Sequence, residues 1–167
     1  MSESLTHFDE SGRSRMVNVG DKPTTQRVAV ASASVEMDPK TAALVADRKL
    51  SKGDVFEVAR IAGIMAVKQT PNLIPLCHSV QVDSVDIKFE FKSESSLKIV
   101  STVSATDRTG VEMEALASVS VAALTVYDMC KSVDRAMVVR NICLEKKTGG
   151  KSGDFERATD ESPSSTG

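Results

Sequence analysis

The amino-acid sequence predicts an α+β, ferredoxin-like fold, in which an antiparallel sheet carries helices on one face. The elements predicted by its hydropathy pattern follow the β-α-β-β-α-β order of that fold. The chain has 167 residues, the length of one domain, and its 41% apolar and 26% charged residues are typical of a globular protein. We therefore expect a single folded catalytic domain over residues 16–153.

The first half of the chain predicts one strand and two helices. Small apolar and small polar residues alternate over Arg27–Met37, as in a strand. Asp38–Pro39 then has the pattern of an N-cap followed by a first-turn proline, and predicts a short helix to about Arg48. A second helix is expected to begin at the capping-box spacing Asp54–Glu57. It is expected to end at Thr70–Pro71, because a residue before proline avoids helical backbone.

The second half predicts a hairpin, a long helix and a last strand. Apolar and charged residues alternate over Val85–Phe91, and Leu97–Thr106 is the expected hairpin partner. A helix over Val111–Arg135 is expected to begin with a second capping box, Thr109–Glu112. Because this helix is apolar or small nearly all round, we expect it to be buried on most sides. Ala136–Leu144 is the predicted last strand.

Charge and cysteine content limit the classes of function. The chain has 21 Lys and Arg against 23 Asp and Glu, one Tyr and no Trp, so nucleic-acid binding is not expected. Three cysteines without a CxxC pair, and no apolar signal segment, are typical of a cytoplasmic protein. No membrane segment is expected. Residues 1–15 are expected to form a flexible arm, and residues 154–167 a disordered acidic tail.

The segment Leu76–His78 places a cysteine beside a histidine, directly after the Pro71–Pro75 turn. Adjacent side chains seldom ligate one ion, and the sequence has no CxxC or HxxxH partner for them, so no metal site is expected. The motif also has a structural interpretation, with Cys77 buried in a loop and His78 at the surface.

Acidic residues lie near both ends of the predicted long helix. Glu112 fits a helix cap, whereas the Glu114 carboxylate has the two acceptors that match the edge of a guanine or pterin ring. Asp128 and Lys131 share a helix face and form either a surface ion pair or an acid–base pair. At about 1.5 Å per residue, Glu114 and Asp128 lie about 21 Å apart on nearly the same face. If both serve one site, that site must be shared between subunits.

The segment from Lys146 to Gly153, KKTGGKSG, combines lysines, hydroxyl groups and glycines. Such a loop either approaches an anion with its backbone, assisted by the lysines, or is a solvated basic segment. It is not a Walker A loop, because that motif requires a glycine at the position of Glu145 and a helix after the loop.

Five segments closely resemble the signatures of one family, the cyclic pyranopterin monophosphate synthases of molybdenum cofactor biosynthesis. They are LTHFDESGRSRMVNV, KGDVFEVARIAGIMAVKQT, LIPLCHS, TGVEMEALASVSVAALTVYDMCK and KTGGKSGDF, within about residues 5–155. The family usually has proline after the Cys-His pair, where this chain has Ser79. The resemblance implies a ferredoxin-like fold, in agreement with the hydropathy pattern.

The resemblance implies a phosphorus–oxygen lyase. Its substrate would be a cyclised GTP derivative, 3′,8-cyclo-7,8-dihydroguanosine 5′-triphosphate, and its products cyclic pyranopterin monophosphate and pyrophosphate. The family assembles as a hexamer of dimers with sites between subunits. No cofactor is required by the sequence, which has no dedicated cage for metal but is compatible with a substrate-bound Mg²⁺. The alternative is a non-catalytic, oligomeric nucleotide-binding module, which would not require Asp128 and Lys131 together.

The resemblance also assigns the candidate site residues. Asp128 is the implied catalytic acid or base, with Lys131 as its partner and Lys52 as a further functional lysine. The implied substrate-binding residues are Leu76, Cys77, His78, Glu112, Met113, Glu114, Lys147, Lys151, Arg27, Lys68 and Arg108.

Overall fold

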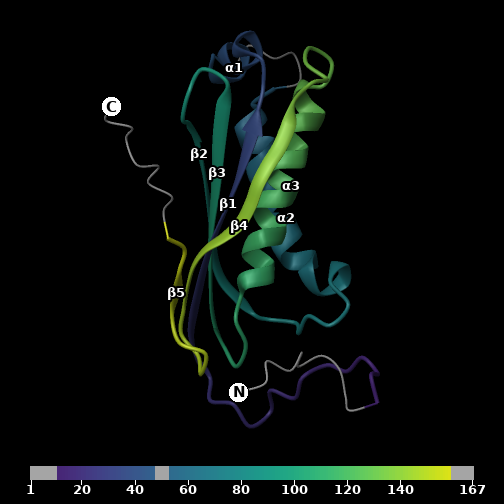
Figure 1. Ribbon diagram of the computed structural model, residues 1–167, viewed down its shortest axis with the longest axis vertical. Helices are drawn as coiled ribbons and strands as arrows, with labels where there is room; N and C mark the ends of the chain where they lie inside the picture. The colour runs from purple at the N-terminus through teal and green to yellow at the C-terminus, as the bar shows by residue number, and fades with distance from the viewer. Residues whose placement is uncertain (1–10, 48–52, 159–167) are drawn as a thin grey trace, which may run out of the picture.

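The structure is a computed structural model that describes residues 11–47 and 53–158 (Figure 1). Within these ranges, five strands form one antiparallel sheet in the order β2-β3-β1-β4-β5. The strands are β1 (Thr25–Glu36), β2 (Val82–Phe91), β3 (Ser96–Asp107), β4 (Val138–Thr148) and β5 (Phe155–Glu156). The helices are α1 (Pro39–Ala46), α2 (Val55–Leu73) and α3 (Glu112–Cys130). The first four strands have the order of a ferredoxin-like fold, and that prediction is confirmed.

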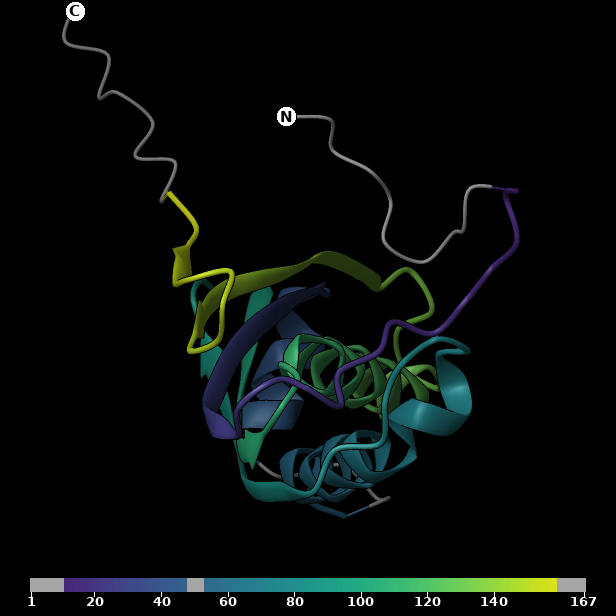
Figure 2. The same cartoon turned by 90° about the horizontal axis from the view of Figure 1, so that it is seen from below.

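Helices α2 and α3 lie on one face of the curved sheet (Figure 2). Helix α3 packs on β1, β3 and β4, and α2 packs beside it against β2. The inward side chains of β1 include Ala29, Ala31 and Ala33, all buried, and these small residues leave room for the long helix. Gly63 of α2 lies close to both α3 and β2, because a Cβ there would lie 3.1 Å from the Ser118 carbonyl oxygen and 2.6 Å from Ile87 Cδ1.

Helix α3 is the core helix of the domain, as the sequence predicts. Half of it is buried, and among its residues only Leu124 and Asp128 are mostly exposed. By length and composition alone this helix is apolar enough to cross a membrane. Its apolar composition is explained by burial between the sheet and α2.

Two predicted helix starts are correct and one predicted helix end is not. The Asp38 side chain accepts the Lys40 N–H at the start of α1, and Asp54 caps α2 in the same way. Helix α2 continues through Pro71 to Leu73, past the predicted end. Thr70, the residue before the proline, stays in the helix, and its buried hydroxyl donates to the Ala66 carbonyl oxygen at 2.9 Å.

Helix α3 begins within one residue of its predicted start, but its expected cap and its predicted end are both wrong. Its N-cap is Val111, which makes no side-chain cap hydrogen bond, so the expected Thr109–Glu112 capping box is absent. The helix ends at Cys130, five residues before the predicted end at Arg135. The backbone N–H groups of Val133 and Asp134 both donate to the Cys130 carbonyl oxygen, which closes a turn in place of a further helical turn.

Strand β4 runs four residues beyond its predicted end and pairs with β5. Part of the expected disordered tail, the strand Phe155–Glu156, is therefore folded onto Lys146 and Lys147. Residues 1–10 of the expected arm and residues 159–167 of the expected tail lie outside the described residues.

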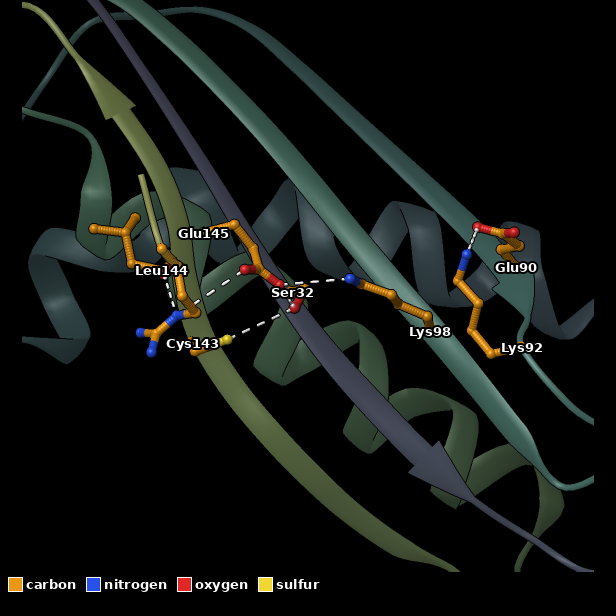
Figure 3. A network of polar contacts seen from close by, with 8 residues as sticks. Ser32, Glu90, Lys92, Lys98, Cys143, Leu144 and Glu145 are labelled. Atoms are coloured by element: carbon orange, nitrogen blue, oxygen red, sulfur yellow. Dashed lines mark hydrogen bonds and ion pairs between the residues drawn. The ribbon is translucent and has the colours of Figure 1, made fainter. Parts of the chain in front are cut away.

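The outer face of the sheet carries a polar network at an irregularity of β4 (Figure 3). Glu145 is skipped in the β1–β4 register, and its carboxylate accepts a hydrogen bond from the Ser32 hydroxyl at 2.5 Å. Lys98 Nζ lies 3.5 Å from the same carboxylate oxygen. The Ser32 hydrogen bond and the Lys98 charge hold the pKa of Glu145 below its ordinary value, against an opposing effect of burial.

Candidate functional site

A cationic pocket of about 420 Å³ lies where the start of α3, the β4–β5 turn and the region before β1 meet. Its lining carries one carboxylate, that of Glu112, against five cationic side chains. These cations are Lys22, Arg27, Arg108, Lys147 and Lys151. The excess of positive charge favours a ligand with several negative charges, such as a polyphosphate.

Arg27 is fixed in place by the backbone at the end of β3. Although only 8% exposed, its guanidinium donates from Nε to the Asp107 carbonyl oxygen and from Nη2 to that of Arg108, both at 3.1 Å. The β4–β5 turn passes close to this guanidinium. Gly150 has a φ of +88°, and a Cβ there would lie 1.6 Å from Arg27 Nη1. Glycine is therefore required both for the backbone angle and for the close approach.

Lys147 links the β4–β5 turn to the start of α3. Its Nζ donates a hydrogen bond to the Ser152 hydroxyl and lies 3.8 Å from Glu112 Oε1. The Glu112 carboxylate in turn lies over Gly110, where a Cβ would be 1.9 Å from Glu112 Oε2. These contacts hold the Lys147 ammonium group at the pocket.

A second pocket, of about 500 Å³, adjoins the cationic pocket. The two share Thr109, Gly110 and Glu112, and the second is also lined by Met113 and by residues 74–78. The predicted segment Leu76–His78 and Met113 therefore lie together, beside the predicted cations. A ligand with an anionic part and a less polar ring fits this arrangement of adjoining pockets.

Glu114 is a buried carboxylate, 1% exposed, next to Cys77. Its Oε1 accepts a hydrogen bond from the Cys77 thiol at 3.8 Å, and its Oε2 has no hydrogen-bond partner within the described part of the chain. Burial raises the pKa of Glu114. Burial and the Glu114 charge together raise the pKa of Cys77 to about 11, so Cys77 is a neutral thiol at pH 7.

Glu114 also lines a third pocket, of about 520 Å³, together with Lys68 and Asp83. Lys68 is therefore grouped with Glu114 and does not line the cationic pocket. The unpartnered oxygen of Glu114 is a strong acceptor in a buried position, where a missing donor is costly. It is the position in this region best suited to receive a donor from a ligand.

The Asp128–Lys131 pair lies at the opposite end of α3, which is close to α1 and far from the β4–β5 turn (Figure 1). Lys131 Nζ is 2.5 Å from Asp128 Oδ1, and both side chains are more than half exposed. The hydrogen bond and charge of Asp128 raise the pKa of Lys131. Within one chain, Asp128 and Lys131 therefore form a surface ion pair, and not the partly buried acid–base pair that was the alternative. Both Glu114 and Asp128 lie on this one helix, which keeps them about 21 Å apart.

Lys52, a predicted functional lysine, lies outside the described residues. Lys22 was not predicted, yet it lines the cationic pocket. The sequence signal for Lys22 is weak, because it is a single cation in an irregular segment five residues before Arg27.

Fold and pockets together define a ferredoxin-like α+β protein with a site for an anionic small molecule. Residues 16–150 match the MoaC family, and the chain belongs to this family. It is 57% identical over 153 residues to the cyclic pyranopterin monophosphate synthase of Herpetosiphon aurantiacus, covering 91% of this chain and 93% of that protein. It is 52% identical over 157 residues to the protein of the same name from Brevibacillus brevis, covering 94% and 98%. The Clostridium acetobutylicum protein of that name is 50% identical over 158 residues, with coverage of 94% and 98%.

Proposed function

We propose that this chain is a cyclic pyranopterin monophosphate synthase. It converts 3′,8-cyclo-7,8-dihydroguanosine 5′-triphosphate to cyclic pyranopterin monophosphate and releases pyrophosphate. The observation that carries this proposal, beside family membership, is the cationic pocket that adjoins the pocket of Leu76–His78 and Met113. A cyclised guanosine triphosphate has the same two parts, a polyanion and a ring system.

The cationic pocket holds the triphosphate and stabilises the leaving pyrophosphate. Closing the cyclic phosphate requires a sugar hydroxyl to attack the α-phosphorus, and catalysis of such a transfer depends on positioning and charge stabilisation. Arg27 is already oriented by two carbonyl oxygens, and Lys147 by Ser152 and Glu112. Mg²⁺ carried by the triphosphate would add charge to this step, and the protein supplies the remaining cations.

Glu114 receives the donor groups of the guanine-derived ring. Its unpartnered Oε2 accepts from the ring edge, and Cys77 holds the other oxygen. The raised pKa of Cys77 argues against a thiolate nucleophile, so the cysteine acts as a hydrogen-bond donor. His78 and Met113 line the adjoining pocket and contact the substrate there.

Asp128 and Lys131 transfer protons while the imidazole ring opens and the new ring closes, with Lys52 as a further catalytic residue. Because Asp128 lies about 21 Å from Glu114 on one helix, the pair completes the site of a second copy of the chain. Burial against that copy would lower the Lys131 pKa from its value in the single chain. We accordingly propose a cytoplasmic homo-oligomer, a hexamer of dimers.

An apolar stripe on α2 supports the oligomer. Val58, Ile61 and Met65 are 40%, 59% and 58% exposed, and their spacing places them on one side of the helix. A monomer would leave this stripe in water, whereas a second subunit would cover it. Light scattering is expected to give a mass several times the 17.8 kDa of one chain, and a 17.8 kDa particle at micromolar concentration would contradict the shared site.

The proposed activity is tested by incubating the purified protein with the cyclised triphosphate. Pyrophosphate and the pyranopterin product are measured together, with and without Mg²⁺. Equal amounts of both products are expected, and their formation should fail in a variant with Asp128→Asn. Tight binding of the substrate without any pyrophosphate release would instead indicate a nucleotide-binding module.

A further inference from the structure

The connection between α3 and β4 is held by one buried carboxylate, that of Asp134, which is 9% exposed. Its Oδ2 accepts the backbone N–H of Asp38 at 2.8 Å, and its Oδ1 accepts the backbone N–H of Ala136 at 3.0 Å. Each oxygen therefore has one backbone donor. The first of these bonds joins the connection to Asp38, the residue that caps α1.

Lys131 lies at the start of this connection. It is the C-cap of α3, and its N–H donates to the Tyr127 carbonyl oxygen at 2.8 Å. The next bonds all close the same turn. The N–H of Asp134 donates to the Cys130 carbonyl oxygen at 3.1 Å, and the Tyr127 hydroxyl donates to the Arg135 carbonyl oxygen at 3.2 Å. The backbone on both sides of Lys131 is thus fixed, from one side by the helix and from the other by Asp134.

We propose that Asp134 is a positioning residue that sets the placement of Lys131 beside Asp128. The inference rests on the proposed function, in which that pair transfers protons. In the single chain Lys131 has an exposed, flexible side chain, and it is the last residue that the helix holds, so the chain that follows it is held by the turn closed at Asp134. Asp134 acts only through this backbone.

The test is Asp134→Asn in the full-length protein. The amide keeps the size of the carboxylate but accepts with only one oxygen, and its NH₂ group then faces a backbone N–H. We expect kcat to fall by roughly 10- to 100-fold, as for a misplaced catalytic group, with KM unchanged. Asp86→Asn is the matched control, because Asp86 is an exposed carboxylate on β2, paired with Lys88 at 3.6 Å. That variant should keep the original kcat.

A milder variant covers the case in which Asp134→Asn does not fold. Tyr127→Phe removes only the hydrogen bond to Arg135 and keeps the ring, so a smaller fall in kcat is expected, again at constant KM. A loss confined to KM, or an unchanged kcat in the folded variants, would overturn the inference.

A second measurement needs no turnover. Trace acetylation followed by mass spectrometry gives the reactivity of Lys131 relative to Lys92, a lysine paired with Glu90 on β2. Releasing Lys131 from Asp128 lowers its pKa, so its relative reactivity should rise in the Asp134 variant. Unchanged reactivity would refute the positioning role. If the unaltered protein releases no pyrophosphate, the proposed function fails, and this measurement still decides whether Asp134 holds Lys131.

Discussion

Replacing Glu114 with glutamine separates its role in binding from its role in folding. Glu114 is buried, and its Oε2 has no partner within the described residues, so ionising it in the folded chain is unfavourable. In Glu114→Gln the side chain keeps its size but loses the charge. One of the two acceptors becomes an NH₂ group, which would face the ring donor in the proposed binding mode. Leaving one buried donor unsatisfied costs about 1–3 kcal/mol, or roughly 5- to 150-fold in affinity.

The same substitution is expected to increase stability at neutral pH. Burial raises the pKa of Glu114 in the folded state, so folding favours its protonated form. The stability of the unaltered protein therefore decreases as the pH rises from the ordinary pKa of 4.5 through the raised value, because the buried group must then ionise. Glutamine does not titrate. The Tm of the variant should therefore exceed that of the unaltered protein near pH 7, and this difference should shrink near pH 4.

Two assays check these opposite effects. Calorimetry gives the affinity for the cyclised triphosphate, and thermal unfolding from pH 4 to 8 gives the difference in Tm. Glu112→Gln is a useful comparison, because Glu112 is only partly buried and lies 3.8 Å from Lys147. Unchanged affinity in Glu114→Gln would refute the role in ring recognition. A difference in Tm that does not vary with pH would refute the argument from burial.

Three further results are expected. Lys147→Ala should weaken binding of the triphosphate by roughly 10-fold or more and reduce the salt dependence of that binding. Lys146→Ala should do neither, because Lys146 pairs with Glu156 at 3.6 Å. Equal effects of the two variants would contradict the pocket assignment. Asp128→Asn and Lys131→Ala should each lower turnover by at least about 100-fold, and the double variant should be little worse; additive losses would argue against a functional pair. Mixing inactive Asp128→Asn subunits with inactive Glu114→Gln subunits should restore some activity. If subunit exchange is verified and no activity returns, the shared site is excluded.

The local pattern predicted the elements whose signals lie within a few residues. The β2–β3 hairpin follows from alternation, and the start of α1 follows from Asp38–Pro39. The end of helix α3 has no such local signal: the turn after it contains Asp134, whose carboxylate accepts from the backbone N–H of Asp38, 96 residues earlier in the chain. Strand β5 has two residues, too few to give a pattern, and exists only through pairing with β4.

The candidate site was predictable in its residue types and less so in its grouping. Lys147, Gly149 and Lys151, with Arg27 and Arg108, do line one cationic pocket. Glu114 Oε2 lacks a hydrogen-bond partner within the described residues because of how the surrounding elements bury it, and residue spacing along a helix does not predict that burial. The exposure of Asp128 in one chain likewise depends on which surfaces pack together.

Helix α3 sets a fixed distance between the two ends of the proposed shared site, since Glu114 and Asp128 are both part of the helix. Inserting one residue between them would move one end by about 1.5 Å and rotate it by about 100° about the helix axis. Both subunits of a two-fold pair would carry the same error, so the mismatch would occur twice at each interface. Changes in the length of this helix are therefore far more damaging than substitutions at its exposed positions, such as Leu124. Attempts to re-engineer the enzyme for a larger substrate should alter the pocket loops and keep the residue count of α3.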